Sequence, residues 1–279
     1  MKNIRTDLKK KTIIIKFLFL AYGISWLAWL PAILASHEII SEIPWPPLFA
    51  IGVCGPLIAA LICIYQENGW SAVRRWFRNG FSHQINGFWW CVILVIPFLV
   101  PALALWIYRI FDGEMVDLKV VQQPWIILPA ILLMVTIGGG QEEYGWRGFL
   151  LPRLDEFLPV WQTNLLMIPL HACWHLPLFI ITYTMQSQYS FWLFLIFGIG
   201  FTPLINRVFR STGGSFIAAI LFHGLTNAGL DVFPPVGPYV NHSPIPLLII
   251  TTLLITSNLL LIGKNTWKRS SSYANQKGI

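Results

Sequence analysis

The chain has 279 residues, of which 56% are hydrophobic and 11% are charged, whereas a soluble domain carries about 25% charged residues. Together with 14 Trp and 19 Phe, this composition excludes an ordinary soluble domain and predicts a membrane protein with aromatic residues near the lipid–water boundaries. The formal net charge of +7 does not indicate a nucleic-acid partner, because the basic residues flank apolar runs as the positive-inside rule requires.

Eight apolar runs follow one another along the chain, and a membrane span needs about 20 such residues. Only helices and closed barrels satisfy the backbone in lipid, and these runs lack the alternation of barrel strands. The sequence therefore predicts an all-α, polytopic transmembrane helix bundle in the cell membrane, with residues 142–158 as a partly embedded connector. The expected spans are 12–35, 46–65, 87–110, 124–141, 160–183, 190–206, 213–231 and 245–263.

The basic residues predict how this bundle is oriented. With eight spans, 17 of the 19 Lys and Arg residues fall on one side, and Arg109 and Lys119 fall on the other. Basic residues concentrate on the cytoplasmic side, so both termini are expected in the cytoplasm. The first run is too long for the apolar part of a signal peptide and is expected to remain as an uncleaved span.

Three polar clusters interrupt the apolar pattern. Ionisable residues in a membrane segment are costly and are therefore candidates for function. One cluster lies in the connector, one in the fifth span and one in the seventh. They consist of Glu142, Glu143 and Arg147, of His171 and His175, and of His223 and Asn227.

The spacing within the connector separates its two carboxylates. Glu143 and Arg147 are four residues apart, so an ion pair on one helix face is expected. Glu142 then points about 100° away and meets a different partner. The glycines at 138–140 should loosen the helix just before it. A purely structural reading remains open, in which the ion pair caps and orients the connector and the histidines join helices.

These side chains suit hydrolysis. A carboxylate can take a proton from water, and a histidine can orient that water or pass the proton on. A His/Asn pair can donate hydrogen bonds to a developing oxyanion. Glu and His are also metal ligands, so a divalent metal such as zinc is a further possibility, although the H-E-x-x-H pattern of zinc proteases is absent.

The sequence resembles the CAAX protease and bacteriocin-processing family of intramembrane endopeptidases. The residues that carry this resemblance are "EEYGWR", "WHLPLF" and "HGLTN", which are similar to three ordered motifs of that family. The resemblance covers roughly residues 120–235. It implies a catalytic core at 120–235, three variable transmembrane helices in 1–119, and a last helix with a basic tail in 236–279.

The resemblance also implies roles in the first two motifs. Glu142 would be the general base that activates water, and Glu143 would support the site through Arg147. His175 would help to position or activate that water. His171 stands where the family usually has an aromatic residue, and it would be an extra polar contact or a supporting partner of His175.

The third motif would serve the substrate. His223 and Asn227 would bind the substrate carbonyl and stabilise the oxyanion. If the site holds a metal, the implied ligands are Glu142, His175 and His223, although the resemblance favours a metal-free glutamate mechanism.

The sequence thus predicts an intramembrane endopeptidase that hydrolyses peptide bonds in or near the membrane from a cytoplasm-facing cavity. Its expected partners are membrane lipids and a peptide or membrane-protein substrate, and its expected setting is bacteriocin processing or self-immunity. Two other classes stay open: a non-catalytic immunity protein or scaffold, and a proton-coupled transporter. The lack of a visible repeat disfavours the transporter.

Overall fold

The computed structural model describes residues 2–41, 43–82, 84–111, 113–114 and 123–262, and the regular structure in these ranges is entirely helical. This confirms the predicted all-α bundle. The basic tail after residue 262 and Lys119 lie outside the described residues. Which side of the membrane each terminus occupies stays a prediction.

Three of the described helices are long and apolar enough to cross a membrane. They are α1 (Lys2–Ser36, apolar from Leu8), α4 (Gly87–Ile110) and α11 (Phe191–Ser211). A fourth span results if α2 (Trp45–Val53) and α3 (Gly55–Phe81), which meet at 43°, are counted together. The expected spans 124–141, 213–231 and 245–263 correspond to shorter apolar helices.

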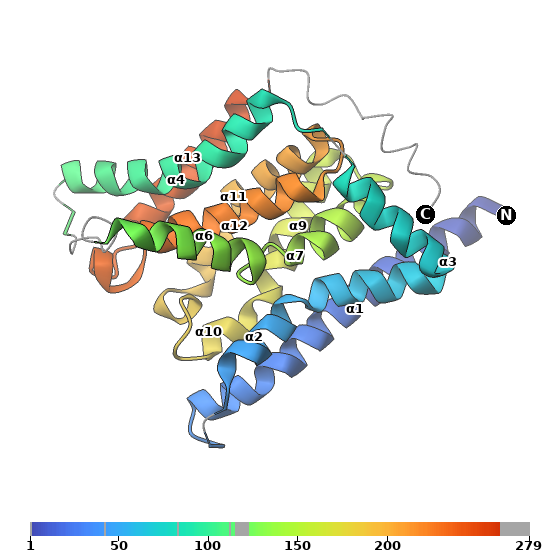
Figure 1. Ribbon diagram of the computed structural model, residues 1–279, viewed down its shortest axis with the longest axis horizontal. Coiled ribbons are helices and arrows are strands. Elements are labelled where there is room, and N and C mark those ends of the chain that lie inside the picture. Colours follow the sequence, from blue (N-terminus) through green and yellow to red (C-terminus); the bar gives the residue numbers. More distant parts are fainter. Residues whose placement is uncertain (1, 42, 83, 112, 115–122, 263–279) are drawn as a thin grey trace.

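The first three helices form one side of the molecule. Figure 1 shows α1, α2 and α3 lying together at one edge, with α4 and α13 (Ile245–Leu260) at the opposite edge. Between them lie the elements that carry the polar clusters, among them α12 (Phe216–Val232), which packs against α4 and α6. The polar clusters therefore lie in the middle of the bundle.

The expected fourth span is shorter than predicted. A turn of 3₁₀ helix, η1 (Pro124–Ile126), leads into α6, which covers only Ile127–Thr136. The helix cannot continue to residue 141, because Gly139 adopts a positive φ of 133°, a conformation that side-chain-bearing residues rarely take. The predicted loosening of the helix by the three glycines is confirmed as a complete break.

The expected fifth span is also interrupted. Helix α9 covers Val160–Trp174, and after His175 the chain restarts as α10 (Leu176–Ile180). The proline at position 177 explains the break, since its nitrogen carries no hydrogen for the helical bond and its ring collides with the preceding turn. Residues beyond Ile180 form turns and η3 (Gln186–Gln188) rather than the end of a span.

The connector is a short helical segment between α6 and α9. It consists of α7 (Glu142–Gly145), a single π-helical turn η2 (Trp146–Leu150) and α8 (Leu151–Asp155). Its apolar side chains are buried against α1, where the Phe17 ring lies 5.9 Å from Trp146 and 4.8 Å from Phe149. Isolated π-helical turns often occur at functional sites, and this one directly follows the paired glutamates.

Candidate active site

The turn before the glutamates runs close to α12. A Cβ atom at Gly139 would lie 2.6 Å from Nδ2 of Asn227 and 3.0 Å from Nε2 of His223. The Asn227 amide also donates a 2.5 Å hydrogen bond from Nδ2 to the carbonyl oxygen of Gly138. The first and third motifs are thus held together through the backbone of the turn.

Glu143 is the centre of a buried charge cluster. Its Oε1 accepts a 2.8 Å hydrogen bond from Nη1 of Arg147 and a 2.6 Å bond from Nδ1 of His223. Glu143 and Arg147 have no exposed side-chain area, so the ion pair predicted from their spacing is confirmed. A buried carboxylate is tolerated when a cation and hydrogen bonds compensate its lost hydration, and Glu143 has both.

Glu142 contacts a different histidine from the one expected. Its Oε2 lies 3.0 Å from Nε2 of His171, and both side chains are buried. The resemblance implied that His175 positions or activates the water and that His171 supports it, and these roles stay predictions. The geometry instead brings His171 into direct contact with the carboxylate, because the two histidines lie one turn apart and the first of them points at α7.

His175 has a fixed orientation beside this pair. Its Nδ1 lies 2.9 Å from the backbone oxygen of His171, and because a carbonyl oxygen only accepts, Nδ1 is the donor. In the neutral ring Nε2 then carries the lone pair. The two imidazole rings are perpendicular, with centroids 4.8 Å apart.

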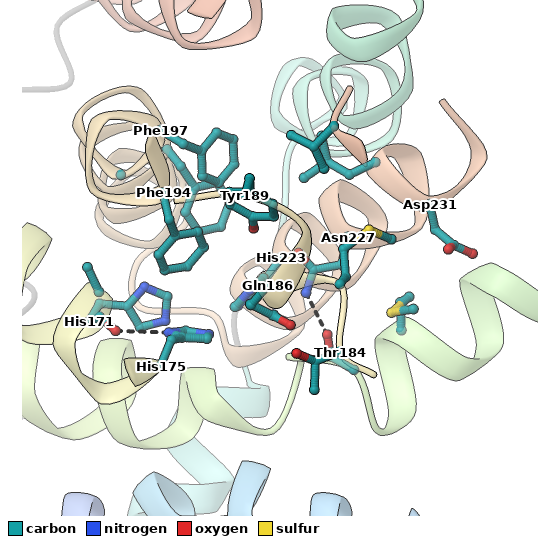
Figure 2. A pocket seen from close by; sticks show the side chains of 18 of the residues that line it. His171, His175, Thr184, Gln186, Tyr189, Phe194, Phe197, His223, Asn227 and Asp231 are labelled. Carbon is teal, nitrogen blue, oxygen red and sulfur yellow. Dashed lines mark hydrogen bonds between the residues drawn. The ribbon is translucent and has the colours of Figure 1, made fainter. Parts of the chain in front are cut away.

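A cavity of about 580 Å³ opens beside the polar clusters. Figure 2 shows His171 and His175 on one side of it and His223 and Asn227 on another. Much of the remaining wall is apolar and includes Phe194, Phe197, Phe201, Leu133, Met134 and Leu230. The cavity can therefore hold an apolar group next to four nitrogen-bearing side chains.

The two glutamates lie behind this wall. They are not among the residues that line the cavity, and Glu142 reaches it through His171. The third polar cluster lies on the wall itself, since His223 and Asn227 both face the cavity from α12. One hydrogen of the Asn227 amide is used by Gly138, which leaves the second for a ligand.

A possible metal-ligand group is present at the same place. Within the described part of the chain, ligand atoms of Glu142, His171 and His175 all lie within 4.8 Å of one another. One carboxylate with two imidazoles is a ligand set that catalytic zinc sites use. This group differs from the predicted set in one member, because it contains His171 in place of His223, whose Nδ1 faces Glu143. The predicted set stays a prediction.

Two asparagines next to the site were missed by the sequence analysis. Asn206 accepts a 3.0 Å hydrogen bond at Oδ1 from Nε of Arg147, and its Nδ2 donates to Oδ1 of Asn164 at 2.9 Å. The available signal was an amide in the middle of an apolar run, which requires a partner in lipid.

Comparison with known proteins agrees with the placement of the motifs. Residues 124–229 match the model of a family described as type II CAAX prenyl endopeptidase Rce1-like. This segment contains all three polar clusters. The central part of the chain is therefore similar to the Rce1-like family. The CAAX prenyl protease 2 of Methanococcus maripaludis is a similar protein, 22% identical over 213 residues that cover 56% of this chain and 79% of that protein.

Similarity to the Rce1-like family has two consequences. It supports a membrane-embedded protein, in agreement with the apolar helices, and it supports a protease, specifically an intramembrane endopeptidase. The division into the ranges 1–119, 120–235 and 236–279 stays a prediction.

Proposed function

We propose that this Rce1-like protein is an intramembrane endopeptidase in which Glu142, together with His171, activates a water molecule at the edge of the cavity. The observation that carries the proposal is the 3.0 Å contact between Glu142 and His171, located where His175 also meets the cavity. In this pair, the carboxylate of Glu142 can accept a proton from the water. The imidazole of His171 lies between that carboxylate and the cavity that would hold the substrate.

The spacing of these three side chains suits a bound water. When three polar atoms lie within 4.8 Å of one another, a point between them is within about 2.8 Å of each, the length of an ordinary hydrogen bond. A water there would contact Glu142, His171 and His175. The carboxylate would take its proton, and the oxygen would attack the substrate carbonyl carbon.

His223 and Asn227 would stabilise the resulting oxyanion. Asn227 has one amide hydrogen beyond the one that binds Gly138, and His223 presents Nε2 towards Gly139. His223 would donate from Nε2 in the form of the ring that carries protons on both nitrogens, with Nδ1 bound to Glu143. Collapse of the intermediate then breaks the C–N bond, and the proton held at Glu142 goes to the leaving amine.

Glu143 and Arg147 would act through His223. The carboxylate fixes the imidazole by its 2.6 Å bond, and the guanidinium fixes the carboxylate by its 2.8 Å bond. Both side chains are buried and neither lines the cavity, so their proposed contribution is the placement and charge of His223.

The proposed substrate is a peptide or membrane protein that places an apolar group beside the scissile bond, because the cavity wall is largely apolar. The similar archaeal protein is named as a prenyl protease, which makes a prenylated peptide one probe. A hydrophobic bacteriocin-type precursor is the second probe and corresponds to a role in bacteriocin processing or self-immunity.

A metal-dependent form of the same reaction is the second candidate mechanism, favoured by the ligand set at the site. Glu142, His171 and His175 would hold the ion, which would supply Lewis-acid activation of water. Removal of metal with a chelator decides between the two forms. Unchanged cleavage supports the glutamate mechanism, and loss that added zinc restores supports the metal.

Cleavage of both peptides by the reconstituted protein tests the function. We expect Glu142→Gln to lower kcat by about 10²–10⁴-fold, the usual contribution of a general base. Glu156→Gln is the matched control, because Glu156 is half-exposed and pairs only with Lys10 among the described residues. Cleavage by Glu142→Gln at the wild-type rate contradicts the proposed mechanism.

The same variants separate the other two classes. A non-catalytic immunity protein or scaffold would protect cells equally well with Gln at position 142. A proton-coupled transporter would show pH-driven flux in liposomes without peptide cleavage.

A further inference from the structure

A chain of side-chain hydrogen bonds leads from the candidate site into the neighbouring helices. It starts at Arg147, passes through the amide of Asn206 on α11 and reaches Asn164 on α9, with bond lengths of 3.0 and 2.9 Å. Each bond joins a different pair of elements. The connector, α11 and α9 are therefore linked by polar contacts within an otherwise apolar region.

The chain continues to the far end of the connector. Oδ1 of Asn164 also accepts a 3.2 Å bond from Nη1 of Arg210, and Arg210 binds both carboxylate oxygens of Asp155 at 2.8 and 2.7 Å. Asp155 is the last residue of α8. Because Asn206 and Arg210 are four residues apart on one face of α11, this face binds the connector at its π-helical turn and at its end.

The amide of Asn206 can take only one orientation in this chain. The side chain has no exposed area, and its oxygen faces a guanidinium N–H while its nitrogen faces a carbonyl oxygen. Rotation of the amide by 180° would place its N–H donor against the guanidinium donor of Arg147. It would also place its oxygen against the accepting oxygen of Asn164. A buried polar group that loses its partners is costly, so the geometry specifies both the orientation of the amide and the spacing of its neighbours.

That spacing bears directly on the candidate site. Asn164 precedes His171 by seven residues, about two helical turns, so both lie on nearly the same face of α9. Arg147 follows Glu142 in the same compact connector. Asn206 thus joins the two elements whose side chains meet at the 3.0 Å contact between Glu142 and His171.

We propose that Asn206 is a positioning residue for hydrolysis, which sets the separation and register of α9 and the connector so that His171 meets Glu142. The catalytic part of this proposal rests on the proposed function. It assigns no contact with substrate, since Asn206 does not line the cavity.

Asn206→Leu tests the proposal with little change in side-chain volume. We expect kcat to fall by about 10–100-fold, because a displacement of about 1 Å at reacting groups can cost 10²-fold. KM should change by less than about 3-fold, since the cavity wall is intact. Asn258→Leu is the matched control, because it removes a similar bond, from Nε of Arg207 at 2.6 Å, between α13 and α11.

A spectroscopic readout makes the test independent of cleavage. The imidazole signals of His171, assigned by their loss in His171→Phe, should shift in Asn206→Leu and stay in place in Asn258→Leu. If the wild-type protein cleaves neither peptide, the proposed function fails while this measurement still tests the positioning. Unmoved His171 signals, or a kcat equal to that of the control, would overturn the proposal.

A second variant covers the case in which Asn206→Leu does not fold. Asn164→Leu breaks the same chain on α9, where the side chain is only half-buried. It should lower kcat in the same way and shift the same signals. If both variants fold, their effects should not add, because each interrupts one shared path, and full additivity contradicts the proposal.

Discussion

Gly139 shows how closely a single residue limits the site. Its φ of 133° and the 2.6 Å approach of a would-be Cβ to Asn227 mean that any side chain there meets strain and a collision together. The sequence predicted a loosened helix at the three glycines. It could not predict which of them faces α12, since that depends on where α12 lies.

We expect Gly139→Ala to lower kcat/KM by about 10–100-fold, because displacing His223 and Asn227 removes donors aimed at the oxyanion. Gly69→Ala is the control, since Gly69 also has a positive φ but a Cβ there meets no atom within 4 Å. Both changes should cost backbone strain, about 1–3 kcal/mol each. Peptide cleavage and thermal unfolding of both variants separate strain from damage to the site, and equal activities would contradict this view.

The two histidines of α9 are a second case at this scale. Their spacing placed both on one face and could not decide which of them meets Glu142. The ordering observed here, with His171 at the carboxylate and His175 bonded to the backbone of His171, depends on how α9 lies relative to the connector. The sequence could predict that two histidines face the site. It could not predict which of them contacts the carboxylate of another helix.

At the scale of elements, close helix contacts hold the third motif in place. The backbone of α12 approaches α4 so closely that a Cβ at Gly229 would lie 2.1 Å from the carbonyl oxygen of Pro97. Small residues permit such approaches between membrane helices, where packing rather than exclusion of water drives association. Gly229 lies two residues beyond Asn227, the end of the motif that contains His223.

Gly229→Ala should therefore destabilise the protein, with a loss of about 1–3 kcal/mol as for other overpacked sites. Gly23→Ala is the control, because a Cβ at Gly23 meets no atom within 4 Å and alanine is the better helix former by about 0.5–1 kcal/mol. Thermal unfolding in detergent should show a lower midpoint for the first variant and an equal or higher one for the second. A midpoint for Gly229→Ala at or above that of the wild type would rule out the tight contact.

The breaks in the helices were the least predictable feature of the elements. Hydropathy located every apolar run, but it is insensitive to the turn at Gly138–Gly140 and to the restart after His175. Both breaks lie at polar clusters. Irregular backbone at membrane depth is tolerated where protein or a cavity satisfies it, and here the turn is satisfied in part by Asn227.

At the scale of the whole molecule, the orientation in the membrane is the main prediction. Seventeen of the 19 basic residues lie on one side if the chain crosses eight times, and an odd number of crossings would expose one basic terminus outside the cell. The described helices include spans and shorter apolar helices. The side of the membrane on which each terminus lies can be measured by labelling single cysteines.

Single cysteines at the two ends test it. In a background with Cys54, Cys63, Cys91 and Cys173 replaced by alanine, Asn3→Cys and Ser272→Cys should react with a membrane-impermeant maleimide only after cell lysis. Ser243→Cys, in the loop between α12 and α13, is the control and should react in intact cells. Labelling of either terminal cysteine in intact cells would contradict the eight-span arrangement.

The sequence by itself determined the class of the protein, its apolar helices, the Glu143–Arg147 pair and the three motifs that carry the similarity to the Rce1-like family. These are local properties, since hydrophobicity and helical spacing act over a few residues. The tertiary structure decided that His171 meets Glu142, that His223 is bound by Glu143, and that Asn206 joins the connector to α9. Such contacts link residues from 29 to 80 positions apart, and only the packing of whole helices brings them within hydrogen-bonding distance.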